Sequence, residues 1–321
     1  MCPWTGFSLV RRAFAALLWA CLGLAALWSP GLACAAAPFP PFADPWSPLI
    51  ERLEREGFER PFLLNLFARP GLVFDPEVMA RKMNALLERR LADRRDQGSE
   101  SKAVYSQFLK PQALREARAF LRENGRELAR IQKRYLVPPE ILVALLLVET
   151  RLGTFVGAQG AFFVLANMAR SRDLALIRER IGRTDLDAET RAWLAKRTEE
   201  KAEWAFAELA ALLRYAQTNG LDPAGIPGSM YGAIGICQFV PSNVLAYGVD
   251  ADRDGRVDLF CGPDALHSMA NYLRRNGWKR SMSERQKLAV IYRYNHSPTY
   301  SRTVLAVASR LSKGKAVKRA R

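Results

Sequence analysis

Histidine, acidic residues and long apolar segments are all scarce in this sequence of 321 residues. It contains 2 histidines, and 48 lysines and arginines stand against 32 acidic residues, which gives a formal net charge of +16. Zinc-finger spacings, homeodomain signatures and aromatic RNA-binding motifs are absent, so we expect no nucleic-acid partner. The excess of positive charge still favours attraction to a polyanion. An anionic cell wall fits this requirement, as does peripheral contact with a membrane surface.

The sequence has one long uncharged run near its start, and this run is too short to be a typical membrane span. Residues 13–28 carry no charge, whereas a transmembrane helix needs roughly 20 apolar residues. Arg11 and Arg12 precede the run, and small residues occupy most of positions 31–37, which is the layout of a secretory signal peptide. We therefore expect residues 1–35 to be removed and the protein to be exported to the periplasm or cell envelope. Cys34 leaves lipid anchoring open.

Few cysteines remain outside this predicted leader. Three of the five, Cys2, Cys21 and Cys34, lie within it. The remaining pair, Cys237 and Cys261, is an even number in an oxidising compartment, which favours a disulfide. A Cys237–Cys261 bridge would close a loop of about 25 residues and stabilise the fold by roughly 3 kcal/mol.

Strand-like alternation of apolar and polar residues is almost absent, so a mainly α-helical protein is expected. We expect helices at residues 75–93, 110–135 and 141–148, two more between 185 and 219, and further helices at 264–276, 283–294 and 300–311. The predicted divisions are a signal peptide at 1–35, an N-terminal helical segment at 36–100, a core at 101–312 and a basic tail at 313–321. The tail is rich in lysine and arginine, and its composition predicts a disordered segment.

Glu149 is the strongest candidate for a catalytic residue. It follows eight consecutive apolar residues, 141–148, and lies near the expected end of their helix. Burial disfavours a charged carboxylate, and the negative end of the helix dipole adds to that effect. Both raise the pKa, as a general acid near neutral pH requires. A structural pairing of Glu149 with Arg151 is the alternative that spacing leaves open.

Four motifs in the same order resemble the membrane-bound lytic transglycosylase B family. They are VPPE at 137–140 with VETRLG at 148–153, GSMYGAIGICQFVPS at 228–242, scattered matches within 255–278, and YNHS at 294–297 followed by Tyr300. The similarity runs from roughly residue 70 to residue 310. The resemblance implies a lysozyme-like helical core with additional N-terminal and inserted helices.

The resemblance also implies a reaction. Family members cleave the β-1,4 bond between N-acetylmuramic acid and N-acetylglucosamine in peptidoglycan glycan strands and leave a 1,6-anhydromuramyl end. Glu149 would then act as the sole acid and base, which fits the lack of a convincing second carboxylate of the kind that ordinary glycosidases use. The residues expected to hold the sugar are Ser229, Gln238, Tyr272, Tyr294, Asn295 and Tyr300. Glycines at 228, 232 and 235 would let the backbone approach the substrate closely.

A calcium loop is expected at residues 250–264. Asp250, Asp252 and Asp254 precede Gly255 in the D-x-D-x-D-G pattern of an EF-hand, and Arg256 can offer its carbonyl. The usual twelfth position is occupied by Cys261, and the resemblance implies a longer loop whose last ligand is Asp264. We expect one structural Ca²⁺ and no organic cofactor.

Three rival functions remain open at this point. A lysozyme-type hydrolase could use the same acid on the same fold. A non-catalytic cell-wall-binding protein could have kept the fold alone, and other cell-wall enzymes are conceivable partners in either case. A cysteine peptidase or amidase would use Cys237 as nucleophile, with His267 or His296 as base.

Overall fold

The computed structural model describes residues 45–95 and 103–319, so the predicted signal peptide, most of the stretch around residue 100 and the last two residues lie outside the described parts. The elements are, in chain order, α1 (Ser47–Arg55), α2 (Arg60–Phe67), α3 (Glu77–Arg95), η3 (Ser106–Leu109), α4 (Pro111–Glu123), α5 (Gly125–Tyr135), α6 (Pro139–Thr150), β1 (Gln159–Gly160), α7 (Ala161–Arg170), η4 (Leu174–Arg180), α8 (Ala188–Thr218), η5 (Pro223–Gly225), β2 (Pro227–Gly228), α9 (Pro241–Tyr247), α10 (Gly262–Arg275), α11 (Glu284–Tyr294) and α12 (Pro298–Arg319). The prediction of a mainly helical fold is confirmed.

Two helix predictions and the prediction of a disordered tail need correction. The helix expected at 110–135 is interrupted at Asn124, which ends α4 and precedes α5, and its side-chain amide donates to the Phe120 carbonyl at 3.0 Å. The two helices expected at 185–219 are one helix, α8, because no glycine or proline interrupts it. Its start is capped by Asp187, whose carboxylate accepts from the Thr190 amide at 2.6 Å. Finally, α12 continues to Arg319, through most of the tail predicted to be disordered.

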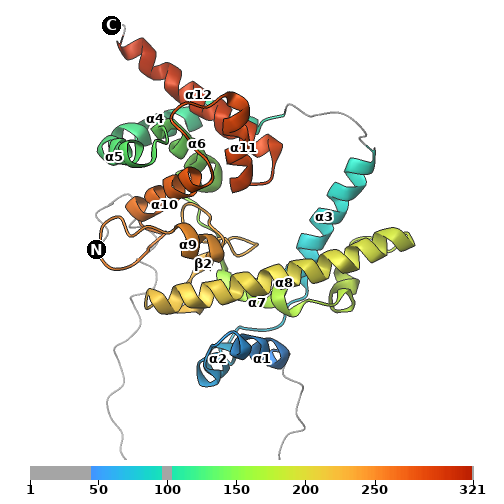
Figure 1. The fold of residues 1–321 in the computed structure, drawn as a ribbon. Helices are drawn as coiled ribbons and strands as arrows, with labels where there is room; N and C mark the ends of the chain where they lie inside the picture. Colours follow the sequence, from blue (N-terminus) through green and yellow to red (C-terminus); the bar gives the residue numbers. More distant parts are fainter. Residues whose placement is uncertain (1–44, 96–102, 320–321) are drawn as a thin grey trace, which may run out of the picture.

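The helix α6 forms the centre of one half of the molecule. Pro139 occupies its first turn, where a proline costs no hydrogen bond. Residues 141–147 are apolar on every side of the helix and buried, as the sequence predicted, because α6 packs against α4, α5, α10 and α12. These helices lie together in the half drawn at the top of Figure 1.

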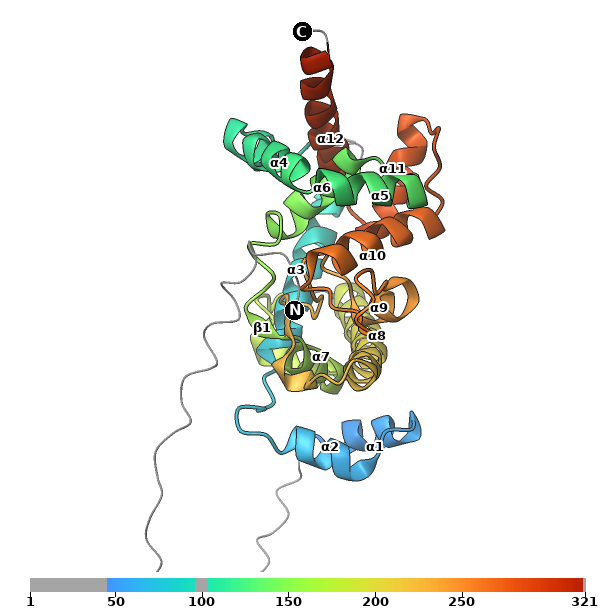
Figure 2. The same cartoon turned by 90° about the vertical axis from the view of Figure 1, so that its left-hand side faces the viewer.

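The other half is built on α7 and the 31-residue helix α8, which pack along one another. Figure 1 shows α8 running across the molecule, with α1 and α2 beyond it at the far end. Figure 2 shows α3 rising from this half toward the helices around α6. A two-residue antiparallel pairing of β1 with β2 places Gln159 opposite Gly228. It joins the loop after α6 to residues 228–242, hereafter the glycine-rich segment.

Within residues 45–95 and 103–319, no helix combines the length and the apolar character needed to cross a membrane.

Candidate functional site

Glu149 lies in the last turn of α6, where the sequence placed it. The helix ends after Thr150 because Arg151 and Leu152 adopt left-handed backbone angles, with φ of 49° and 63°. The amide of Leu152 donates to the Leu146 carbonyl at 3.0 Å and closes the helix end. The Thr150 hydroxyl donates to the Ile236 carbonyl at 2.8 Å. The end of α6 is therefore fastened to the glycine-rich segment, and Glu149 is fixed beside it.

Tyr300 is the direct partner of Glu149. Its hydroxyl donates to Oε1 of Glu149 at 2.5 Å, and the Tyr300 ring on α12 is buried. Burial raises the pKa of Glu149 to about 7, while the hydrogen bond from Tyr300 acts in the opposite direction. Burial, together with the adjacent Glu149, raises the pKa of Tyr300 well above its ordinary value, so the tyrosine stays a neutral donor. This hydrogen bond replaces the ion pair with Arg151 that spacing left open.

The tyrosines predicted to hold sugar form a packed aromatic group beside Glu149. The ring centroids of Tyr272 and Tyr294 lie 5.1 Å apart, those of Tyr247 and Tyr272 lie 4.8 Å apart, and Phe239 lies 5.7 Å from Tyr294. The Tyr272 hydroxyl donates to a backbone carbonyl at 2.7 Å, and the Tyr294 hydroxyl donates to another at 2.6 Å. Both residues therefore help to build the wall of the site, as aromatic packing requires.

The segment 228–242 supplies the other predicted contacts. Ser229 Oγ accepts from the amides of Tyr231 and Ala233 at 3.2 and 3.1 Å. Gln238 adopts a left-handed φ of 50°, and its side-chain amide donates to the Gly235 carbonyl at 2.9 Å and the Val156 carbonyl at 3.3 Å. These bonds fix the shape of the loop and hold the Gln238 side chain in place.

The glycines of this segment also meet a requirement inside the protein. At Gly235, which has a φ of 72°, a Cβ atom would lie 2.4 Å from Cβ of Leu259. At Gly232, with a φ of 79°, it would lie 2.6 Å from the Leu165 side chain. Close approach within the protein thus requires these glycines.

Asn295 ends α11 and is exposed. Its carbonyl accepts from the Ser297 amide at 2.7 Å, which shapes the short connection to α12. This connection places Tyr294 and Tyr300 on the same side, where one contacts the Cys237 carbonyl and the other contacts Glu149.

The predicted disulfide between Cys237 and Cys261 is wrong. Cys237 is a buried free thiol in the turn against Tyr294 and near Glu149, whereas Sγ of Cys261 lies 3.8 Å from Asp252 at the start of α10. The two side chains are directed toward different neighbours, which a count of cysteines cannot reveal. Burial raises the pKa of the Cys237 thiol.

These contacts also argue against the cysteine-peptidase hypothesis. A thiol with a raised pKa is a poor nucleophile. The buried His267 is engaged with Glu127 at 2.7 Å and with the Tyr135 hydroxyl at 3.4 Å, and His296 packs on Tyr292. The contacts of His267 and His296 therefore involve other residues than Cys237.

Three of the predicted calcium ligands come together in the acidic loop. Carboxylate oxygens of Asp250, Asp252 and Asp254 all lie within 4.8 Å of one another. The set is made of hard oxygen donors, and it therefore fits Ca²⁺. Asp250 also accepts from the Gly255 amide at 3.0 Å, which closes the turn.

The other two predicted ligands are placed differently. Asp264 is buried, and its two oxygens accept from the amides of Ala251 and Asp258, each at 2.8 Å. Burial raises its pKa to about 6. The amide of Arg256 donates to Asp254 at 2.9 Å. In this structure Asp264 closes the loop from inside, while the three exposed or half-exposed aspartates face one another.

The loop is tied to the glycine-rich segment, because the Ile236 amide donates to the Leu259 carbonyl at 2.9 Å. Sequence reasoning missed a second anchor of this region. Glu208, buried on α8, accepts from the amide and the hydroxyl of Ser242, both at 2.8 Å, and so fixes the start of α9. Its only sequence signal was a carboxylate on the apolar face of a long helix.

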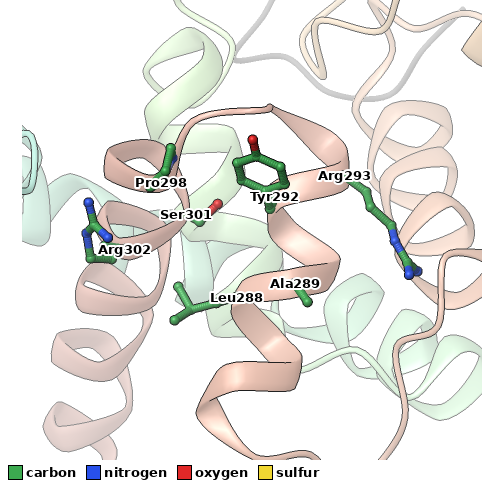
Figure 3. A pocket seen from close by; sticks show the side chains of 7 residues that line it. All are labelled: Leu288, Ala289, Tyr292, Arg293, Pro298, Ser301 and Arg302. Atoms are coloured by element: carbon green, nitrogen blue, oxygen red, sulfur yellow. The ribbon is translucent and has the colours of Figure 1, made fainter. Parts of the chain in front are cut away.

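A separate cavity of about 320 Å³ lies between α11 and α12 (Figure 3). Its lining residues are Leu288, Ala289, Tyr292, Arg293, Pro298, Ser301 and Arg302. None of the predicted site residues is among them, so this cavity is distinct from the surroundings of Glu149.

A half-buried acid at a helix end, held by a tyrosine and fastened to a glycine-rich loop within a helical fold, is the arrangement expected of a lysozyme-like protein. The comparisons agree with this class. Residues 41–287 match the family described as Transglycosylase SLT domain. The chain therefore belongs to the SLT lytic transglycosylase family, and the resemblance to the membrane-bound lytic murein transglycosylase B group is confirmed.

The relatives are as follows. Membrane-bound lytic murein transglycosylase B of Escherichia coli is 33% identical over 171 residues, which are 53% of this chain and 40% of that protein. The chain thus aligns with less than half of this relative's length. The Escherichia coli lytic transglycosylase Slt35, solved in complex with calcium, has a TM-score of 0.60 at 20% identity, with 85% of this chain and 94% of that chain covered. Pseudomonas aeruginosa SltB3, in complex with NAG-NAM-pentapeptide, has a TM-score of 0.59 at 21% identity, with coverages of 83% and 78%.

Proposed function

We propose that this protein is an exported lytic transglycosylase that cleaves the β-1,4 bond between N-acetylmuramic acid and N-acetylglucosamine in peptidoglycan, with Glu149 as its only acid and base. The observation that carries the proposal is the carboxyl of Glu149, buried at the end of α6 with a pKa of about 7 and held by the Tyr300 hydroxyl. A carboxyl with that pKa can both give and take a proton near neutral pH.

The first step uses the protonated form of Glu149. It gives its proton to the oxygen of the scissile bond, the bond from that oxygen to C1 of the muramyl residue breaks, and the N-acetylglucosamine side leaves as an alcohol. The carbonyl oxygen of the neighbouring N-acetyl group forms a bond to C1 and carries the positive charge. Tyr300 stabilises the new Glu149 carboxylate by donating to it.

The second step regenerates the acid. The Glu149 carboxylate accepts the proton of the muramyl C6 hydroxyl, and the C6 oxygen bonds to C1 as the N-acetyl oxygen leaves. The product is a 1,6-anhydromuramyl end, and no water is consumed. A single carboxyl suffices for both steps.

The other buried carboxyls support a single working acid. Glu208 and Asp264 both accept from backbone amides, and Glu140 lies at the opposite end of α6. Each therefore has a structural setting away from Glu149, whereas ordinary retaining or inverting glycosidases use two carboxyls flanking the bond.

The predicted sugar contacts and the calcium remain part of the proposal. Ser229, Gln238 and Asn295, with the tyrosines at 272, 294 and 300, would hold the N-acetyl sugars. The contact of Tyr300 with Glu149 supports this assignment. Asp250, Asp252 and Asp254 would hold one structural Ca²⁺, which would stiffen the loop that is tied to the glycine-rich segment. The signal-peptide layout and the membrane-bound relative support a location in the cell envelope.

Mass spectrometry of products from purified peptidoglycan tests the proposal. Wild-type protein should release muropeptides with 1,6-anhydro ends, and Glu149→Gln should release them about 100- to 10,000-fold more slowly. Products with free reducing ends from the wild type would instead establish a lysozyme-type hydrolase. Binding to peptidoglycan without any product would establish a wall-binding protein.

A further inference from the structure

Two lysines on facing helices form a cluster that the proposed chemistry does not use. Lys82 of α3 and Lys201 of α8, hereafter the lysine pair, are both half-buried. The Lys82 ammonium lies 3.9 Å from the ring centroid of Tyr231, and the Lys201 ammonium lies 5.4 Å from that of Trp204. Among the residues that the structure describes, neither ammonium has a carboxylate within 4.0 Å.

Neighbouring basic side chains, in contrast, form ion pairs with carboxylates. On the same two helices Arg90 pairs with Glu189 at 2.7 Å, and Arg197 pairs with Glu200 at 2.7 Å. Carboxylates are therefore plentiful on this face, yet the lysine pair is left without one.

The two ammonium groups also repel each other electrostatically. Burial lowers the pKa of Lys82, and the nearby Lys201 lowers it further. Burial likewise lowers the pKa of Lys201, where Arg197 adds to the effect and Glu200 counters it. Two unpaired like charges that have lost part of their water are destabilising, and such clusters gather at functional sites. An anion bound between them would remove the cost.

The position of Tyr231 connects the lysine pair to the glycan site. Tyr231 lies two residues after Ser229, and its amide donates to Ser229 Oγ at 3.2 Å. Met230, between them, is 50% exposed, so this turn lies at the protein surface. A chain bound along segment 228–242 would therefore pass the Tyr231 ring against which Lys82 of α3 packs, and α3 in turn contacts α8. Figure 1 shows α3 rising from α8 toward the right of the view, while α9 lies over the left part of α8.

We propose that Lys82 and Lys201, with the Tyr231 ring beneath Lys82, bind a carboxylate of the peptide stem carried by the muramyl residue. Lysine suits this task because its ammonium is a compact charge with three donors that can meet a carboxylate from several directions. The inference rests on the proposed function, since the stem reaches the site only if the glycan lies along segment 228–242. It adds a preference for strands that bear peptides with free carboxylates.

The test measures binding by titration calorimetry in the Glu149→Gln background, so that the ligand stays intact. The probes are a synthetic GlcNAc-MurNAc-pentapeptide and the same compound with its carboxylates amidated. The free acid should bind roughly tenfold tighter than the amide, as expected for a charge-assisted contact. Adding both Lys82→Met and Lys201→Met should abolish this difference. Lys196 is an exposed lysine of α8, and the control substitution Lys196→Met should preserve the difference.

A difference that persists in the double variant, or no difference at all, would overturn the inference. The double variant should melt at the same temperature as its parent or above, because it loses two opposed charges; if it does not fold, the single variant Lys82→Gln serves, with a partial loss expected. Cleavage of peptide-free glycan by proteins with an intact Glu149 separates the two claims. If the lysine variants cleave it like the wild type, only stem recognition is in question. If the wild type cleaves no glycan, the proposed function fails while the calorimetry still decides on the lysine pair.

Discussion

The end of α6 and the acidic loop at residues 250–264 use the same functional group in opposite ways. Glu149 is a single carboxyl among apolar and aromatic side chains, and burial raises its pKa to about 7. In the loop, three carboxylates gather near the surface, within 4.8 Å of one another. Loss of water around a lone carboxyl favours its protonated form, whereas a surface cluster of carboxylate oxygens offers the hard donors that Ca²⁺ prefers. The surroundings, more than the residue type, decide the role.

The largest expected effect comes from removing the lone acid. Glu149→Gln keeps the shape of the side chain and loses the proton, so the rate of glycan cleavage should fall by about 100- to 10,000-fold. Release of soluble muropeptides from peptidoglycan measures it. Melting temperature serves as the control for folding. An active Glu149→Gln variant would show that another group supplies the proton.

The loop predicts a smaller effect, on stability. Saturating calcium at about one hundred times its dissociation constant should raise the free energy of unfolding by about 2.7 kcal/mol, and a chelator should remove this gain. Asp252→Asn should reduce the gain while leaving the calcium-free protein unchanged.

Asp264→Asn provides the contrast within the same loop. It alters the carboxyl that binds two backbone amides, so stability should fall with or without calcium. Thermal melts of both variants, with and without calcium, decide between these roles. If both variants showed the same change in melting temperature, with and without calcium, Asp252 and Asp264 would not have different roles.

Tyr300→Phe tests the partner of the lone acid. Loss of the hydroxyl should lower the turnover number by about tenfold, since a hydrogen bond to a charged carboxylate is removed. It should also raise the pKa of Glu149, because that hydrogen bond lowers it. The basic limb of the rate profile should therefore move to higher pH. An unshifted limb with lower activity would mean that Tyr300 only packs.

The smallest effect concerns stability as a function of pH. The folded-state pKa of Glu149 is raised from 4.5 to about 7, so the folded protein binds the proton more tightly than the unfolded chain. This contribution to stability is full below pH 4.5 and is lost as pH rises through 7. Urea unfolding across this range should show a decline that is weaker in Glu149→Gln. The same decline in both proteins would assign it to other groups.

Much of the helical fold could be predicted from the periodicity of apolar residues, and the errors in the predicted helix boundaries have local causes. A continuous apolar pattern could not show that Asn124 would interrupt the helix between α4 and α5, because its side chain bonds to the preceding turn. Nor could charge composition show that 188–218 is one helix, since the exposed and buried halves differ in character. The basic tail was expected to be disordered, but α12 extends through most of it.

The site divides in a similar way. Eight apolar residues before a glutamate are enough to predict a buried acid, and the D-x-D-x-D-G spacing brought the three aspartates together as expected. The partner of Glu149 could not be derived from spacing, because Tyr300 is 151 residues away along the chain. The predicted disulfide between Cys237 and Cys261 was wrong for the same reason, because the number of cysteines does not show where their side chains point.

The sequence by itself determined the helical class, the family, the buried acid and the acidic loop, because each depends on residues that are close in the chain. Only the tertiary structure decided which distant groups meet. It gave Glu149 a tyrosine donor, left Cys237 a buried thiol, turned Asp264 toward backbone amides and set Lys82 beside Lys201. Packing of α3, α6, α8 and α12 fixes those distances, and no local pattern encodes them.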